Sequence, residues 1–294
     1  MTTELSYPAV VTRLRAAGCV FAEDEARLLL AAAQTPTELA ALVERRVAGF
    51  PVEQVIGWAE FCGLRIVVEP GVFVPRRRTE LLVREALELL RAAAAGSTAA
   101  AAVEAGAAGA SGAAGATGPI AARPVVLDLC CGTGAVGAAI AAAVGAIELY
   151  AADVDPAEVR CARRNLADAG GRVFEGDLYE PLPATLRGRV DVLVVNAPYV
   201  PSEAIRLMPP EARLHEARVA LDGGADGLDV QRRVIEGAPA WLAPGGWLLI
   251  ETSEAQAPHT AEAIARNGLV PRVVRSEDLD GTVVVGRWAA PNVR

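Results

Sequence analysis

The feature that most constrains this 294-residue chain is a glycine-rich turn between a strand pattern and a helix pattern. Residues 125–130 are a short apolar run, and residues 134–144 are an alanine-rich run long enough for a helix. Gly132, Gly134 and Gly137 join the two as Gly-x-Gly-x-x-Gly. A strand, a glycine turn and a helix in this order are typical of the ligand-binding corner of a doubly wound α/β sheet.

The rest of the C-terminal half continues this alternation of strand and helix patterns. Strands are expected at 125–130, 147–153, 172–176, 190–195, 247–252, 272–275 and 282–287, and helices at 134–144, 156–169, 229–241 and 255–267. Strands that alternate with helices predict a doubly wound, mainly parallel α/β sheet, here with seven strands. Ligands of such sheets bind at the carboxyl ends of the strands.

The first third of the chain has a different pattern. Helix patterns at 8–16, 22–33 and 36–47 predict a small helical N-terminal domain over residues 1–62. Residues 63–91 are expected to connect it to the sheet, through a β-hairpin with strands at 65–68 and 72–75 and a helix over 79–91. Residues 92–123 are rich in alanine and glycine and predict a flexible insertion, because glycine opposes a regular helix. Residues 124–294 then form the sheet domain.

Composition excludes several classes of protein. The 28 Lys and Arg residues against 36 Asp and Glu residues give a net charge of −8, which disfavours a stable grip on nucleic-acid phosphates. Aromatic residues make up only 4%, too few for a base-stacking platform. Neither a secretory signal nor a membrane-spanning run is visible, so we expect a cytoplasmic protein. The five cysteines have irregular spacing, and we expect no metal site.

Acidic residues at the strand ends help to decide which ligand the glycine turn binds. NAD and S-adenosylmethionine (AdoMet) both fit the turn, and Asp153 at the next strand end suits a ribose diol in either. Asp128, four residues before the first glycine, would repel a pyrophosphate but suits the ammonium group of a methionine moiety. Asp177 is placed for an adenine amino group. Each acid could instead be a helix cap or turn residue, but together they favour AdoMet.

The turn Asn196-Ala197-Pro198-Tyr199 follows the apolar run at 190–195. A planar amide nitrogen is a poor nucleophile because its lone pair is delocalised. An Asn side-chain carbonyl and a nearby backbone carbonyl could accept its two N–H bonds and stabilise the positive charge that develops on it. Tyr199 could pack on the planar group, and Pro198 would fix the turn. The alternative is an ordinary strand-exit turn. With the glycine turn, the pattern predicts methylation of an amide or amino nitrogen without an acid or base side chain.

Six blocks of this sequence resemble the HemK/PrmC family of bacterial release-factor glutamine methyltransferases. They lie at residues 51–57, 60–64, 69–76, 79–83, 127–134 and 216–229, and the resemblance covers nearly the whole chain apart from the insertion. It implies a Rossmann-like methyltransferase fold and an enzyme that uses AdoMet. The implied reaction is methylation of the side-chain amide nitrogen (N5) of a glutamine in a protein, foremost the Gly-Gly-Gln glutamine of a peptide chain release factor.

The resemblance also implies which residues form the site. The cofactor-binding residues would be Asp128, Cys130, Gly132, Thr133, Gly134, Asp153, Val154, Asp177, Leu178 and Asn196. Phe61, Pro75, Arg76, Thr79 and Glu80 would bind the substrate. The catalytic turn would be Asn196, Ala197, Pro198 and Tyr199.

Two departures from the family pattern matter. Ala197 stands where the family has the first proline of Asn-Pro-Pro-Tyr, and it keeps the backbone carbonyl, so we expect activity with a less rigid turn. Arg77 and Arg78 replace a proline and an acid of Arg-Pro-Glu-Thr-Glu. They could be a solvated helix entry, or they could mark a branch with another glutamine-bearing target. An adenine-N6 nucleic-acid methyltransferase and a catalytically silent AdoMet-binding module remain open as other functions.

Overall fold

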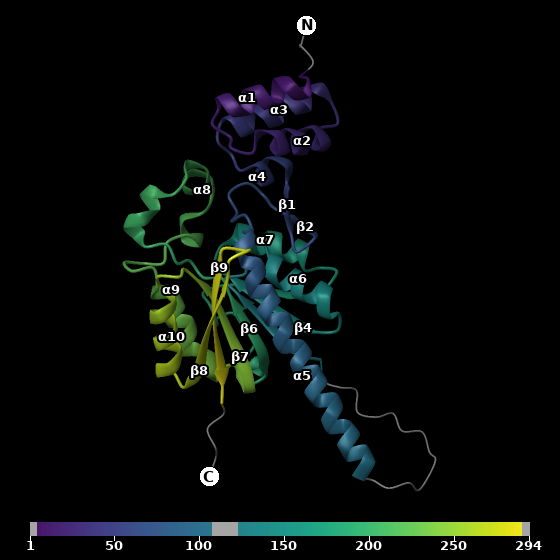
Figure 1. The fold of residues 1–294 in the computed structure, drawn as a ribbon, viewed down its shortest axis with the longest axis vertical. Coiled ribbons are helices and arrows are strands. Elements are labelled where there is room, and N and C mark those ends of the chain that lie inside the picture. The colour runs from purple at the N-terminus through teal and green to yellow at the C-terminus, as the bar shows by residue number, and fades with distance from the viewer. Residues whose placement is uncertain (1–4, 108–122, 290–294) are drawn as a thin grey trace.

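A seven-stranded sheet forms the centre of the structure, a computed structural model that describes residues 5–107 and 123–289 (Figure 1). The strand order is β5-β4-β3-β6-β7-β9-β8, with β9 antiparallel to both of its neighbours and the other pairs parallel. The strands are β3 (Val125–Leu129), β4 (Glu148–Asp153), β5 (Arg172–Glu175), β6 (Val190–Val195), β7 (Leu242–Thr252), β8 (Leu269–Ser276) and β9 (Gly281–Trp288). This confirms the doubly wound, mainly parallel sheet expected from the sequence.

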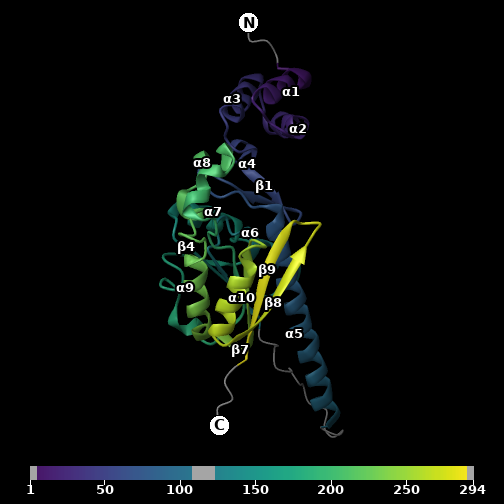
Figure 2. The same cartoon turned by 60° about the vertical axis from the view of Figure 1, so that its left-hand side comes forward.

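Helices cover both faces of this sheet. One face packs against α5 (Glu80–Ala107), α6 (Ala135–Val144) and α7 (Pro156–Asn165), and the other against α9 (Asp229–Gly237) and α10 (Ala257–Arg266). Strand β3 is buried at every position, as a strand covered on both faces must be. Figure 2 shows α9 and α10 together on the side of the sheet away from α5.

The N-terminal helices have a hydrophobic core of their own. Helices α1 (Tyr7–Ala16), α2 (Ala22–Ala32) and α3 (Pro36–Val47) confirm the three expected helix patterns, and a short α4 (Val52–Ile56) follows. Their buried side chains form one cluster separate from the two sheet cores. Thr35 caps α3 by accepting a hydrogen bond from the Glu38 backbone N–H at 3.1 Å. The domain boundaries proposed after residues 62 and 123 remain predictions.

The connecting β-hairpin exists, but its predicted position is wrong. It joins β1 (Trp58–Phe61) to β2 (Leu64–Val67), so that only residues 65–67 of the expected first strand belong to it. The turn residues Cys62 and Gly63 both have positive φ, 50° and 75°, as a two-residue turn between twisted strands requires. A non-glycine residue in this conformation is uncommon, which hid the turn. Residues 72–75 form no strand and pack against α7 instead.

The helix expected to end at residue 91 continues as α5 to Ala107. Alanine has the highest helix propensity, and over this stretch it outweighs Gly96 and Gly106, which cost about 1 kcal/mol each. The prediction of a flexible insertion from residue 92 is therefore wrong up to Ala107. The part of that prediction at residues 108–122 lies outside the described residues.

A long segment between β6 and α9 returns to the N-terminal helices. It contains α8 (Pro210–His215) and the short 3-10 turns η3 (Ser202–Leu207) and η4 (Arg218–Ala220). Two further 3-10 turns, η2 (Ala184–Leu186) and η5 (Ala238–Ala240), lie elsewhere in the sheet domain, and η1 (Arg77–Thr79) precedes α5. The Gln54 side chain donates to the His215 carbonyl at 3.0 Å, and the rings of Phe50 and His215 lie 4.0 Å apart. No helix in the described ranges is long and apolar enough to cross a membrane.

Candidate active site

A cavity of about 760 Å³ opens at the carboxyl ends of β3, β4 and β6. Its walls come from the glycine turn, the strand ends and the segment that connects the hairpin to α5. The predicted site residues that line it are Phe61, Pro75, Arg76, Thr79, Asp128, Cys130, Gly132, Thr133, Asp153, Val154, Asp177, Leu178, Asn196, Ala197, Pro198 and Tyr199. Residues from distant parts of the chain thus meet at the sheet edge where this fold binds its ligands.

Two predicted site residues, Gly134 and Glu80, are absent from the cavity wall. A Cβ on Gly134 would lie 3.1–3.2 Å from Leu166 and Ala162, so glycine there lets α6 begin close against α7. The Glu80 carboxylate accepts from the Cys62 backbone N–H at 3.4 Å, at the turn of the hairpin. Both residues have these structural contacts, and their predicted roles in ligand binding remain predictions.

Asp153 holds the backbone of the glycine turn. Its carboxylate accepts from the N–H of Gly132 at 2.9 Å and from that of Asp155 at 3.0 Å. Burial raises the pKa of Asp153, and these backbone donors oppose the rise. Cys130 and Gly132 both have φ of 53°, and left-handed backbone at a residue such as Cys130 concentrates at ligand-binding sites. Asp153 thus lies at the end of β4 beside the glycine turn, where its carboxylate could accept hydrogen bonds from a ribose diol.

Asp128 is a buried carboxylate on the same wall, with 2% of its surface exposed. One oxygen accepts from the Gly137 N–H at 3.0 Å, and burial raises the pKa of Asp128 to about 8. A cation beside this group would offset the cost of burying its charge. The acid therefore fits an ammonium group and opposes a pyrophosphate, so the wall fits AdoMet better than NAD.

Glu158 is a cavity residue that the sequence interpretation missed. One carboxylate oxygen accepts from the Phe73 N–H at 2.5 Å, which ties the connecting segment to α7. The other oxygen is buried and has no hydrogen-bond partner among the described residues. Burial raises the pKa of Glu158 to about 8. An acid in the first turn of a helix, as Glu158 is in α7, is already favoured by the helix dipole. Nothing local in the sequence therefore signals its contact with Phe73.

An ion pair lies in the cavity wall at the end of β5. Asp177, expected near an adenine amino group, lies 2.6 Å from the guanidinium of Arg233 on α9. Both residues line the cavity and both side chains are about half exposed. Arg233 was not expected from the sequence, because only the fold brings α9 beside the end of β5.

The turn after β6 is held to the connecting segment on one side. The Asn196 side-chain NH₂ donates to the Thr79 hydroxyl at 3.4 Å, which leaves the side-chain oxygen Oδ1 available as an acceptor. The Tyr199 hydroxyl donates to the Glu251 carboxylate at 3.3 Å. Ala197 is almost fully buried, and its carbonyl has no backbone partner in the part of the chain that the structure describes.

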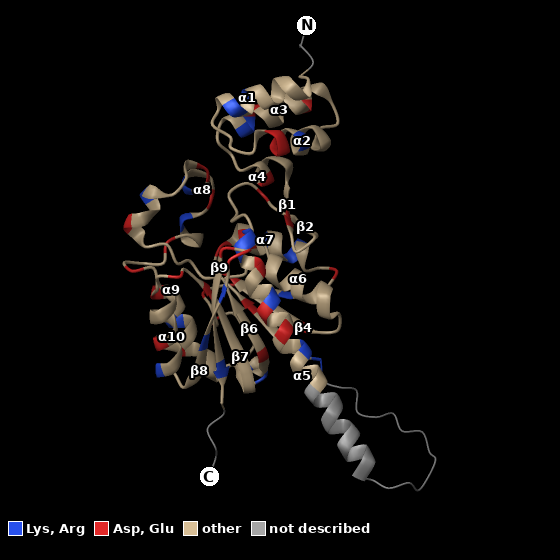
Figure 3. Ribbon diagram, viewed as in Figure 1, with Lys and Arg blue, Asp and Glu red and all other residues tan. Residues whose placement is uncertain are grey.

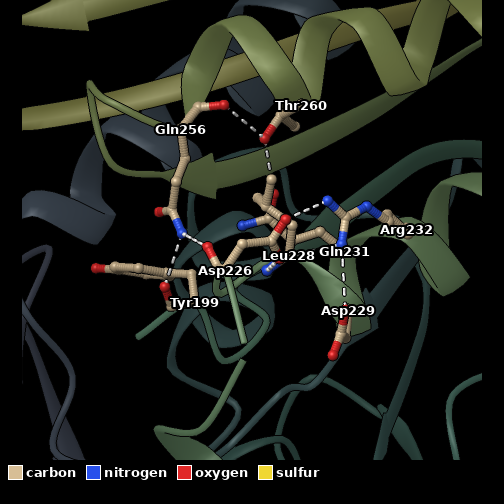
Figure 4. Close-up of polar contacts among 8 residues, drawn as sticks. All are labelled: Tyr199, Asp226, Leu228, Asp229, Gln231, Arg232, Gln256 and Thr260. Carbon is tan, nitrogen blue, oxygen red and sulfur yellow. Dashed lines mark hydrogen bonds and ion pairs between the residues drawn. The ribbon is translucent and has the colours of Figure 1, made fainter. Parts of the chain in front are cut away.

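The loop at residues 222–229 packs against the backbone of the turn (Figure 4). The Gln256 side chain donates to the carbonyls of Tyr199 and Asp226, both at 3.0 Å. Gly227 has φ of 78°, and a Cβ there would lie only 2.3 Å from the Tyr199 carbonyl oxygen. The Gly223 N–H donates to the Val200 carbonyl at 2.9 Å. This close approach of two backbones explains why the loop is rich in glycine.

Two buried carboxylates, Glu216 and Glu251, each lie within 4.0 Å of an arginine side chain at the site. Figure 3 shows acidic and basic residues close together at the end of the sheet that faces the N-terminal helices. Glu251 is buried, which raises its pKa, while the Thr79 hydroxyl, Arg78 and Tyr199 oppose the rise. Glu216 is also buried with a raised pKa, and it forms an ion pair with Arg76. No cluster of three or more metal-ligating side chains occurs in the ranges 5–107 and 123–289.

Comparison with known proteins gives methyltransferases as similar proteins. A family model described as "Methyltransferase small domain" matches residues 119–226. A release factor glutamine methyltransferase of Geobacter sulfurreducens is 37% identical over 79% of this chain and 72% of its own length. One from Bradyrhizobium diazoefficiens is 30% identical over 95% of this chain and 91% of its own length.

A relative of another name is about as similar. A 4-amino-L-phenylalanine/4-methylamino-L-phenylalanine methyltransferase of Streptomyces pristinaespiralis is 34% identical over 71% of this chain and 63% of its own length. Among solved structures, the release factor-specific protein-(glutamine-N5) methyltransferase of Alicyclobacillus acidocaldarius is 20% identical, with a TM-score of 0.40 over 76% of this chain and 99% of that one.

Proposed function

This chain belongs to the release factor glutamine methyltransferase family, and we propose that it methylates the side-chain amide nitrogen of a glutamine in a peptide chain release factor. It is an AdoMet-dependent enzyme, and the release factor methyltransferases among its relatives support a protein substrate. The observation that carries the proposal is the turn at residues 196–199. Among the described residues, its Asn196 side-chain oxygen and Ala197 carbonyl accept no hydrogen bond, and both residues line the cavity.

The chemistry needs little beyond orientation and charge stabilisation. AdoMet, when bound, supplies a methyl group on a positively charged sulfur. Asn196 Oδ1 and the Ala197 carbonyl accept the two N–H bonds of the glutamine amide and aim its nitrogen at that methyl group. Transfer would break the methyl–sulfur bond and leave a neutral thioether, and the two acceptors would stabilise the positive charge on the nitrogen until one of its N–H protons is lost to water. Tyr199 packs against the planar amide, with its hydroxyl fixed by Glu251 at 3.3 Å.

The cofactor residues are proposed from the walls of the cavity. Asp153 binds the ribose hydroxyls, Asp128 faces the ammonium group and Asp177 lies toward the adenine. Support comes from the backbone that these acids hold: the Gly132 N–H bonds to Asp153 at 2.9 Å and the Gly137 N–H to Asp128 at 3.0 Å. Cys130, Thr133, Val154 and Leu178 complete this wall.

The protein substrate is proposed to approach between the N-terminal helices and the sheet. Glu211 lines the cavity and also forms an ion pair with Arg46 of α3 at 3.3 Å. The N-terminal helices therefore lie beside the cavity, where they could contact a protein substrate. We assign residues 1–62 to substrate recognition.

A direct test incubates the purified protein with methyl-labelled AdoMet and a peptide chain release factor. We expect label on the Gly-Gly-Gln glutamine alone, located by mass mapping of the peptides. The matched control is the same factor with that glutamine replaced by asparagine, which should stay unlabelled. Label in nuclease-sensitive material would favour an adenine-N6 methyltransferase, and AdoMet binding without any transfer would favour a silent binding module.

A second candidate function is N-methylation of an amino group on an aromatic amino acid. The 34% identity to the Streptomyces pristinaespiralis enzyme favours it. An arylamine nitrogen also has a delocalised lone pair, so the same two acceptors could orient it. This chain covers only 63% of that relative, against 72% of the Geobacter sulfurreducens protein. Methylation of 4-amino-L-phenylalanine but of no release factor would select this alternative.

A further inference from the structure

Three consecutive arginines precede α5, and the structure gives each a different environment. Arg76 lines the cavity, but its guanidinium is already paired with the fully buried Glu216 side chain. Arg77 is exposed and does not line the cavity. Arg78 lines the cavity with 47% of its side chain exposed.

Arg78 is a cation with unused donor capacity. Its Nε lies 4.0 Å from the nearer Glu251 oxygen, and that oxygen already accepts from the Tyr199 hydroxyl at 3.3 Å. The other arginines of the cavity have close partners: Arg76 bonds directly to Glu216, and Arg233 lies 2.6 Å from Asp177. A guanidinium carries five N–H donors, and that of Arg78 makes no hydrogen bond to the described residues.

The guanidinium of Arg78 lies on the acceptor side of the site. The next residue, Thr79, accepts the hydrogen bond from Asn196 at 3.4 Å. Burial raises the pKa of Tyr199, and the positive charge of Arg78 opposes this rise. The charge of Arg78 therefore acts near the turn. Arg233, by contrast, belongs to the end of the cavity beside Asp177.

We propose that Arg78 is a specificity-determining residue that binds a carboxylate on the acceptor, close to the nitrogen that is methylated. A guanidinium fork binds a carboxylate through two parallel hydrogen bonds, and Arg78 has free donors and an exposed face for this. The inference rests on the proposed function and adds to it that the acceptor presents a carboxylate close to the methylated amide. The same carboxylate chemistry is present in a free amino acid, which is the acceptor of the second candidate function.

A purely structural role of Arg78 predicts a different pattern of effects. If Arg78 only balanced the charge of Glu251, its loss would shift Tyr199 and lower the rate for every acceptor equally. A carboxylate-binding role changes the preference among acceptors instead. The experiment must therefore compare acceptors that differ in charge.

The test measures kcat/KM with three Gly-Gly-Gln peptides whose following residue is Glu, Gln or Lys. The parent should prefer the Glu peptide over the Lys peptide by about tenfold, a free-energy difference of about 1.4 kcal/mol. R78Q should remove the preference and R78E should reverse it. The matched control is R77Q, which removes a neighbouring charge that does not line the cavity and should retain the parent's preference.

The outcomes separate this inference from the proposed function. Methylation of all three peptides at equal kcat/KM by the parent overturns the inference and leaves glutamine methylation standing, as does an equal loss on all peptides in R78Q. Methylation of 4-amino-L-phenylalanine alone, with a KM about tenfold higher in R78Q, upholds carboxylate binding and overturns glutamine methylation. Calorimetric peptide binding to each variant gives the same comparison without turnover, and equal affinities for the Glu and Lys peptides overturn the inference.

Discussion

Replacing Gly227 by alanine tests whether the loop at residues 222–229 positions the catalytic turn. A Cβ there would lie 2.3 Å from the Tyr199 carbonyl oxygen and 2.4 Å from the Gln256 side-chain nitrogen. Neither contact is tolerable, so the loop and the turn must move apart. The hydrogen bond from Gln256 to Tyr199, now 3.0 Å, would then be lost.

The expected magnitude has two parts. Left-handed backbone at φ of 78° destabilises the folded state by about 1–2 kcal/mol when the residue is alanine. Loss of the Gln256 hydrogen bond adds about 1 kcal/mol. We expect the free energy of unfolding to fall by about 2–3 kcal/mol. Because a displacement of about 1 Å can cost 10²-fold in rate, we expect kcat to fall by about that factor while AdoMet affinity stays near the parent's.

Gly188 provides the matched control. It has φ of 69°, and a Cβ there would have no atom within 4 Å, so Gly188→Ala has only the destabilisation from left-handed backbone. Chemical denaturation, methyl-transfer kinetics and calorimetric AdoMet binding should be measured on both variants. If Gly227→Ala matched Gly188→Ala in stability and kept the parent's rate, the positioning role of the loop would be refuted.

Three further variants test other parts of the site. Asp153→Ala should weaken AdoMet binding by about 1–3 kcal/mol by calorimetry, because a carboxylate bonded to a diol is charge-assisted, and unchanged affinity would remove Asp153 from the site. Burial raises the pKa of Glu158 from 4.5 to about 8, so its contribution to stability is full below pH 4.5 and is lost as the pH rises through 8. Glu158→Gln cannot titrate and should make the free energy of unfolding less dependent on pH over this range, and an unaltered pH profile would contradict this. Ala197→Pro should transfer methyl groups at the parent's rate or faster because the backbone carbonyl is kept, and a large loss in rate would show that the proline does not fit.

The sheet and most of the cavity wall could be predicted from the sequence because their signals are local. The glycine turn, the acids at the strand ends and the turn at 196–199 each combine a strand exit with residues of definite chemistry. The parallel topology then brings these strand ends to one edge. The same reasoning placed Asp153 and Asn196 on one cavity, where the structure has them.

What the sequence could not supply depends on contacts between distant segments. The Phe73–Glu158 hydrogen bond and the Asp177–Arg233 ion pair join residues that are 85 and 56 positions apart. The hairpin was misplaced because Cys62 takes a positive φ that favours glycine or asparagine. The end of α5 was misplaced because alanine propensity opposed two glycines, and neither signal alone decides a helix end.

The most direct test of amide methylation by the turn at 196–199 is methyl transfer by Asn196→Ala to a Gly-Gly-Gln peptide, measured beside AdoMet affinity. Asn196 contacts the acceptor amide through Oδ1, and loss of one preorganised polar group of this kind costs about 10²–10³ in rate. The account predicts that loss in kcat, with AdoMet binding within a few-fold of the parent. Transfer to the peptide at the parent's rate would contradict both the role of the turn and the amide-methylation mechanism.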